Sequence, residues 1–140
     1  MLDNMAAPYG VFLLRVALGV MFLAHAGLKI FVFTLAGTVG FFESVGLPGI
    51  MAYATIFAEL VGGVALLLGL FTRQVAVALI PLLAGTILFV HGANGWAFAN
   101  EGGGWEYPAF LIAALVAQSL LGDGAFSLRS PRNQRREALA

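Results

Sequence analysis

Four long apolar stretches dominate the pattern of hydrophobic and polar positions along this chain. They cover residues 8–33, 50–71, 74–91 and 107–121, and shorter segments with polar and turn-forming residues separate them. A membrane-spanning helix takes about 20 residues, so each stretch approaches the length that a crossing requires. We therefore predict an all-α integral membrane protein, a four-helix up-down bundle that forms one domain over residues 1–140.

The segment between the first two stretches has a mixed pattern. Residues 34–49 combine apolar side chains with Thr38 and Glu43, and a proline, Pro48, lies near their end. Alternation of this kind over so short a segment is typical of a helix that lies in the membrane interface. We predict a short interfacial helix between the first and second spans.

Two other segments are expected to lie outside the membrane core. The loop 92–106 combines turn-forming residues with Trp96 and Trp105, side chains that favour the membrane surface, and is predicted to be an interfacial lid. Residues 123–140 are expected to be a frayed, basic cytoplasmic tail. This tail carries Arg129, Arg132, Arg135 and Arg136.

Composition excludes a soluble globular protein. Hydrophobic residues make up 61% of the chain and charged residues only 10%, whereas soluble domains are about 45–50% apolar and about 25% charged. The net charge is zero, which provides no basis for binding nucleic acid. The chain has no cysteine, so it forms no disulfide, thiol relay or cysteine-ligated cluster of its own.

The cations predict the orientation in the membrane. In a four-span arrangement, Arg15, Arg73 and the four arginines of the tail lie on the side of both termini, and Lys29 lies on the other. This six-to-one bias predicts that both termini are cytoplasmic. Ala24-His25-Ala26 resembles a signal-peptidase site, but no basic region precedes the apolar run and Arg15 lies inside it, so we expect no cleavage.

Charged residues within the spans are the first candidates for function. Arg15 and Glu59 lie in the first and second stretches, and an unpaired charge at membrane depth is costly. We predict that the two side chains contact each other inside the bundle. Such a pair is either a structural link between antiparallel helices or the border of a ligand pocket, in which the arginine orients a carbonyl group and the glutamate relays a proton.

A second group of polar residues is expected near the outer ends of the helices, where it would line one cavity beneath the tryptophan lid. This group comprises His25, Lys29, His91, Asn94, Glu106 and Tyr107. Taken singly, each residue also has a purely structural explanation: Tyr107 suits the aromatic belt at the membrane surface, and Lys29 can extend its ammonium group to the interface. Facing histidines such as His25 and His91 ligate haem or copper in some bundles, but two ligands without closely spaced partners make that assignment unfavourable, and we predict no metal site.

Several short motifs follow one another along most of the chain. They are LRVALG at 14–19 followed by His25 and Lys29, FF at 41–42 with GLP at 46–48, ELVGG at 59–63, LGLFTR at 68–73, His91 with NG at 94–95, and EY at 106–107. Their order and spacing resemble those of the DoxX family of small bacterial membrane proteins. The resemblance implies a four-helix protein of the bacterial inner membrane, similar to the membrane subunit of a thiosulfate:quinone oxidoreductase. Since this chain lacks cysteine, direct handling of thiosulfate would fall to a partner chain.

Two classes of function follow from these observations. In the first, the chain is a membrane subunit of a redox system that binds a quinone within the bundle and receives electrons from a soluble or membrane partner protein. Arg15 and Glu59 are then the catalytic candidates, and the ligand-binding candidates are His25, Lys29, His91, Asn94, Trp96, Glu106 and Tyr107. In the second, the chain is a non-catalytic assembly partner or a small-solute carrier whose buried charges are structural. Purified protein without quinone or redox activity would indicate the second class.

The cation distribution makes topology directly testable. We expect a reporter fused to the C-terminus to be active in the cytoplasm, because the tail arginines, Arg15 and Arg73 are all assigned to that side. The side on which the C-terminus lies is measured with reporters that are active on only one side of the membrane. A C-terminal reporter active only outside the cytoplasm would reverse the side assignment of every polar group.

Overall fold

The computed structural model describes residues 5–128, and all the regular structure in this range is helical. Helix α1 (Ala7–Gly27) continues into a π-helical turn, η1 (Leu28–Val32), and is followed by the short helix α2 (Leu35–Ser44). Helix α3 (Ile50–Leu68) leads to α4 (Thr72–Thr86), which continues into a second π-helical turn, η2 (Ile87–His91), and a 3-10 turn, η3 (Gly92–Asn94). Helix α5 (Glu106–Leu121) is the last element. The all-α prediction is confirmed for the described residues.

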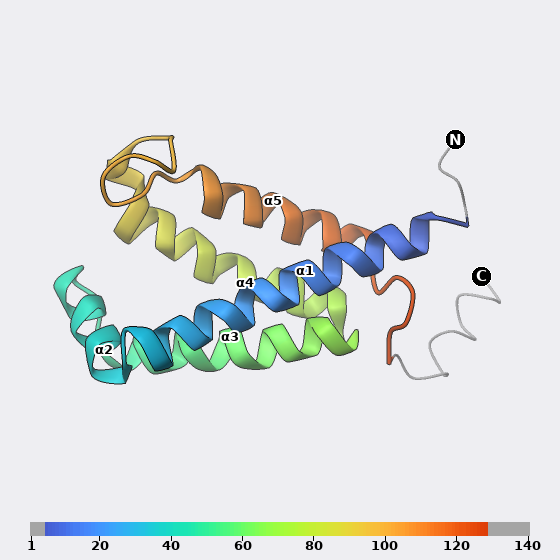
Figure 1. Ribbon diagram of the computed structural model, residues 1–140, viewed down its shortest axis with the longest axis horizontal. Coiled ribbons are helices and arrows are strands. Elements are labelled where there is room, and N and C mark those ends of the chain that lie inside the picture. The colour runs from blue at the N-terminus through green and yellow to red at the C-terminus, as the bar shows by residue number, and fades with distance from the viewer. Residues whose placement is uncertain (1–4, 129–140) are drawn as a thin grey trace.

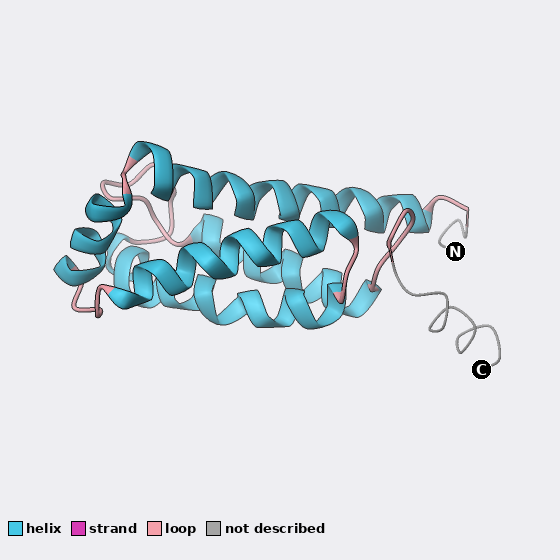
Figure 2. Ribbon diagram, turned by 90° about the horizontal axis from the view of Figure 1, so that it is seen from below, coloured by secondary structure: helices cyan, strands magenta, loops and turns pink. Residues whose placement is uncertain are grey.

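The long helices run along one axis of the molecule in two pairs. Helices α1 and α3 form one pair and α4 and α5 the other, and the pairs diverge toward the end that carries α2 and the 92–105 loop (Figure 1). Seen at a right angle to that view, α2 lies across this same end (Figure 2). At the opposite end the chain after α5 returns to the start of α1, where Ala125 N–H donates to Pro8 O.

Three helical segments of the described chain are long and apolar enough to cross a membrane: Ala7–Val32, Ile50–Leu68 and Thr72–Asn94. Helix α5 is also apolar but has only 16 residues. At a rise of about 1.5 Å per residue it is roughly 24 Å long, shorter than a hydrocarbon core of about 30 Å. The four arginines of the predicted tail lie outside the described residues.

Local sequence accounts for the helix ends. Proline occupies the first turn of α1, where its missing N–H breaks no helical hydrogen bond. Helix α3 is terminated by the residue that follows it, Gly69, which has a left-handed conformation (φ 69°). Helix α2 begins after Thr34, whose hydroxyl accepts a hydrogen bond from Gly37 N–H at 3.2 Å.

Glycines bring α1 and α3 into close contact. A Cβ atom added at Gly19 would lie 2.9 Å from Gly63 O, and one added at Gly63 would lie 3.0 Å from Gly19 O. Small residues permit this approach, and in a membrane such packing replaces the hydrophobic effect as the source of helix association. The two helices are therefore held in a fixed register at this level.

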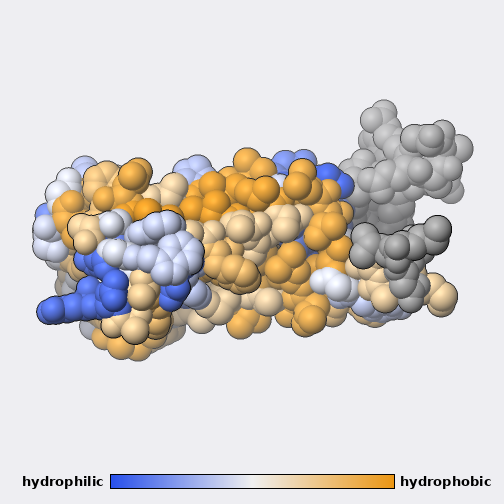
Figure 3. All heavy atoms as spheres, turned by 90° about the horizontal axis from the view of Figure 1, so that it is seen from above, coloured by the Kyte–Doolittle hydropathy of each residue, from blue (hydrophilic) through white to orange (hydrophobic). Residues whose placement is uncertain are grey.

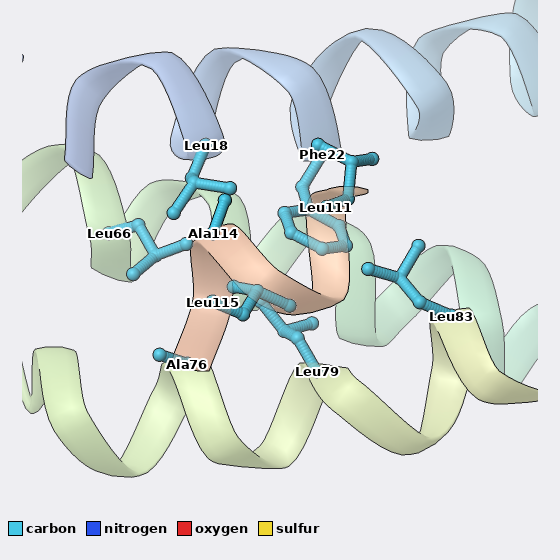
Figure 4. Packing of buried hydrophobic residues seen from close by; sticks show 9 residues of the cluster. All are labelled: Leu18, Phe22, Leu66, Ala76, Leu79, Leu83, Leu111, Ala114 and Leu115. Atoms are coloured by element: carbon cyan, nitrogen blue, oxygen red, sulfur yellow. The ribbon is translucent and has the colours of Figure 1, made fainter. Parts of the chain in front are cut away.

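The apolar core lies between the two helix pairs. Leu18 and Phe22 of α1 pack with Leu66 of α3 and with side chains of α4 and α5 (Figure 4). Many large apolar side chains on the outer faces of the helices are exposed. One face of the molecule is mainly hydrophobic along its middle, and hydrophilic residues gather at the end that carries the 92–105 loop (Figure 3). This distribution fits lipid around the middle of the bundle.

The close approach of α1 and α3 predicts the effect of a single methyl group. Gly19→Ala should destabilise the protein by about 1–3 kcal/mol because the added carbon meets the backbone of α3. Gly10→Ala, on the same helix with open space around it, should be neutral or stabilising by up to about 1 kcal/mol. Unfolding in mixed detergent micelles with increasing dodecyl sulfate measures both. Equal stability of the two variants would show that the glycine contact does not set the helix spacing.

Candidate functional site: a polar cavity between the helix pairs

A cavity of about 90 Å³ lies where the two helix pairs diverge. Its walls come from α1, η1, α3, α4, η2 and α5, and half of its lining residues are apolar. The polar members of the lining are His25, Lys29, Glu59, Thr86, His91 and Tyr107. All four long helices, with their π-helical extensions, thus contribute a polar side chain to one space.

A buried ion pair forms one wall of the cavity. Lys29 Nζ donates to Glu59 Oε1 at 2.7 Å and to Oε2 at 3.0 Å, and the Glu59 side chain is 3% exposed. The Lys29 side chain is 18% exposed, and both residues of the pair line the cavity. In low-dielectric surroundings each charge depends on the other, because an unpaired charge there is costly.

Both histidines of the chain reach the cavity, and each has one ring nitrogen held by the backbone. His25 Nδ1 lies 2.7 Å from Met21 O, and His91 Nδ1 lies 2.9 Å from Gly103 O. A carbonyl oxygen only accepts hydrogen bonds, so Nδ1 carries the proton in each ring and Nε2 is left to accept or exchange one. The rings are thereby fixed in orientation before any ligand binds.

Tyr107 links α5 to α1 at the cavity. Its ring stacks on His25 with centroids 6.1 Å apart, and its hydroxyl donates to Met21 Sδ at 3.9 Å. The packing between α1 and α5 is less extensive than that within each helix pair. Tyr107 therefore closes the less tightly packed interface, the seam between α1 and α5, beside the polar cavity.

Two π-helical turns carry residues of the site. Lys29 belongs to η1 and His91 is the last residue of η2. In η2, Gly92 N–H donates to Ile87 O, a π-type bond across five residues. Such turns widen a helix locally and are frequent at functional sites because they redirect side chains.

Arg15 lies in a different part of the bundle from this cavity. Its guanidinium is fully buried, and Nη1 donates to Leu66 O at 2.7 Å and to Leu67 O at 2.9 Å. Nη2 donates to Ala125 O at 3.0 Å, in the segment after α5. The last carbonyl groups of a helix lack intrahelical partners and carry partial negative charge, so the arginine caps α3 and ties the returning chain to it.

The predicted contact between Arg15 and Glu59 is therefore wrong. Glu59 pairs with Lys29, and Arg15 binds carbonyl groups seven and eight residues further along α3. Seven residues correspond to roughly 10 Å along a helix axis, so the guanidinium meets the end of α3 before it reaches the carboxylate. Arg15 lies at the end of the bundle opposite α2, and its hydrogen bonds there go to backbone carbonyl oxygens.

Only some of the polar residues that were predicted to form one group near the outer ends of the helices meet in the cavity. His25, Lys29, His91 and Tyr107 share the cavity with Glu59. Asn94 instead braces the loop, with Nδ2 donating to the carbonyl oxygens of Val90, Gly102 and Gly103. Glu106 accepts from Phe98 N–H at 2.7 Å, and Trp96 packs edge-to-face on Trp105, with ring centroids 4.6 Å apart. The lining of the cavity does not include these loop-bracing side chains.

Two of the lining residues that the sequence analysis did not select, Thr86 and Met21, have a side-chain oxygen or sulfur atom. Thr86 is a polar residue within an otherwise apolar stretch, five positions before His91, and this placement was the available signal. Met21 has no such signal, since methionine is ordinary in an apolar helix. Among residues 5–128 there is no group of three or more His, Cys, Asp or Glu side chains positioned to hold a metal ion.

Comparison with known proteins identifies relatives that cover most of the chain. The sequence pattern of the DoxX family matches residues 10–92. A protein named "Inner membrane protein YqjF", from Escherichia coli, is 32% identical over 127 residues, which cover 85% of this chain and 88% of the relative. An uncharacterized protein of Haemophilus influenzae is 37% identical over 122 residues, covering 86% of this chain and 89% of that protein.

A further relative matches over a shorter region. "Putative oxidoreductase CatD" of Bacillus subtilis is 44% identical over 87 residues, or 62% of this chain. The match spans 63% of the length of CatD, less than two thirds. No solved structure matches the chain significantly.

The buried ion pair predicts a non-additive mutational response. Lys29→Met should destabilise the protein by about 3–5 kcal/mol because it leaves a buried carboxylate without its partner. Glu59→Met should have a similar effect, and the double variant should recover most of the loss, since two apolar side chains need no compensation. Unfolding in dodecyl sulfate measures all three variants. Additive losses in the double variant would show that the two charges are stabilised independently.

Proposed function

This chain belongs to the DoxX family, and we propose that it is the membrane subunit of a quinone-linked oxidoreductase of the bacterial inner membrane. The observation that carries the proposal is the cavity in which polar groups from all four long helices surround a buried ion pair. The names of two relatives, "Inner membrane protein YqjF" and "Putative oxidoreductase CatD", support the location and the class of reaction.

The proposal includes an arrangement in the membrane. All four long helices cross in an up-down bundle, α2 lies in the interface, and both termini are cytoplasmic. Helix α5 crosses despite its length because a bilayer thins locally around a short span at modest cost. In this orientation the cavity lies toward the outer surface, and Arg15 with the segment 122–128 closes the cytoplasmic end.

The cavity fits the head group of a quinone better than an entire ligand. Pockets that hold complete small molecules usually measure about 300 Å³ or more, and this one measures about 90 Å³. A head group with two carbonyl oxygens needs hydrogen-bond donors on an otherwise apolar wall. Lys29 has a third ammonium hydrogen beyond the two directed at Glu59, and the Tyr107 hydroxyl, which otherwise donates only to Met21 Sδ at 3.9 Å, can turn to a second oxygen.

When bound, a quinone would supply a carrier for two electrons and two protons. Lys29, held by Glu59, orients one carbonyl oxygen of the head group, and the fixed ring of His25 exchanges a proton through Nε2. Glu59 supplies the compensating charge when Lys29 contacts the ligand. The electrons come from a separate redox partner protein, because a chain without cysteine has no thiol relay of its own.

The alternative function is a non-catalytic assembly partner or small-solute carrier. The specific observation in its favour is Arg15, a deeply buried charge whose hydrogen bonds to carbonyl oxygens are explained by structure alone. If the Lys29–Glu59 pair has the same role, the purified protein should contain no quinone.

A pair of matched substitutions tests the proposed function. Glu59→Gln keeps the shape of the side chain but removes its charge, so the folded variant should lose bound quinone and quinol-linked turnover. Glu106→Gln makes the same change at a carboxylate that does not line the cavity and should behave as wild type. Quinone extracted from gently purified protein is quantified per folded chain, and turnover is measured in parallel. A wild type without quinone or activity, or a fully active Glu59→Gln variant, would overturn the proposal.

A further inference from the structure

An apolar groove lies beside the polar cavity, along the seam between η2 and α5. It measures about 450 Å³ and is open to the outside of the bundle. Its lining residues are Ile87, Gly92, Trp105, Ala109 and Ile112. None of them carries a charge, and only the indole of Trp105 has a polar side-chain atom.

The groove and the cavity share a wall. Four of the five groove residues directly follow a cavity residue in the chain: Ile87 follows Thr86, Gly92 follows His91, Ala109 follows Pro108 and Ile112 follows Leu111. Consecutive residues of a helix point about 100° apart. The stretch from the end of α4 through η2 to Gly92, and the first turns of α5, therefore present one set of residues to the polar cavity and the next set to the apolar groove.

The wall is thin and irregular at this place. Gly92 and Ala109 have little or no side chain, and η2 has π-type rather than α-type hydrogen bonds. Pro108 lies in the first turn of α5, where it contributes no N–H to the helix. The shared wall thus contains small residues and local departures from regular helix on both sides of the seam.

We propose that the groove holds the apolar chain of the same molecule whose head group occupies the cavity. This inference rests on the proposed function and specifies its ligand: a compact ring bearing an extended apolar chain, with the chain leaving the bundle between η2 and α5. The two volumes have complementary characters, since polar side chains make up half of the lining of the small space, whereas the larger one is lined by uncharged, mainly apolar residues and is open. The seam between α1 and α5, closed by Tyr107, is not the route of the chain.

The two tryptophans of the sequence make the groove observable. Trp96→Phe leaves Trp105, a groove residue, as the single fluorophore. The full-length variant in nanodiscs is titrated with two benzoquinones that carry decyl chains, one brominated at the middle of the chain and one not. Bromine quenches an indole on contact, so the difference between the two probes reports the chain at Trp105. We expect saturable additional quenching by the brominated probe.

A blocking variant and a matched control add a second readout. In the Trp96→Phe background, Ala109→Phe fills the groove and should abolish the bromine-dependent quenching. It should weaken binding of the chain-bearing probe about tenfold, the order expected for a steric conflict in a packed site. Binding of a benzoquinone without a chain should not change. Ala113→Phe makes the same change one turn further along α5, outside the groove, and should behave like its parent in all three measurements.

The outcomes separate this inference from the proposed function. If both quinones bind and Glu59→Gln weakens them, but bromine adds no quenching, the chain lies elsewhere and the inference is overturned while the proposed function stands. If no quinone binds at all, both fail. If a brominated phospholipid quenches Trp105 as strongly as the quinone probe, and Ala109→Phe abolishes that quenching, the groove is a lipid site and the inference is overturned.

Discussion

The pairing of Lys29 with Glu59 determines how this small bundle is organised around its polar interior. Both charges lie among apolar helices, and neither is stable there without the other. The pair joins η1, the continuation of α1, to the middle of α3, and the glycine contact also holds α1 and α3 together. Because the charges satisfy each other at this level, the adjoining space can contain further polar groups from α4 and α5 without an unpaired charge.

Buried polar groups at the two ends of the bundle have different kinds of partners. At the end where the chain returns to α1, the hydrogen bonds of Arg15 go to backbone carbonyl oxygens, and Gly69 provides the room for its guanidinium. At the end that carries α2, polar side chains face a cavity and retain atoms that can bind or exchange protons. A closed structural end and a polar open end suit a site that is reached from one side. This asymmetry favours a binding function over a continuous pore.

The two π-helical turns also help to position the residues of the cavity. The π-helical turns η1 and η2 extend α1 and α4 and bring Lys29 and His91 to the cavity. Thr38 donates to Lys29 O at 2.9 Å, so α2 braces the backbone of η1 from outside. The loop after η3 holds His91 through the carbonyl oxygen of Gly103. The segments between spans thus position the side chains of the site as well as connecting helices.

The sequence by itself determined the helical, membrane-embedded character of the protein and the approximate limits of its helices, because hydrophobic length and turn-forming residues are local properties. It also identified most of the polar residues of the cavity, since a charge or histidine in an apolar stretch stands out against lipid. It could not decide which cation pairs with Glu59. Arg15 and Lys29 are 14 residues apart in the first apolar stretch, so a regular helix places both on one face and its periodicity allows either to meet the carboxylate. Only the packing of α1 on α3 decided the pairing, because it sets Arg15 against the terminal carbonyl groups of α3 and Lys29 against Glu59. The separation of the cavity from the loop residues Asn94, Trp96 and Glu106 likewise depended on contacts between distant segments, which no local pattern records.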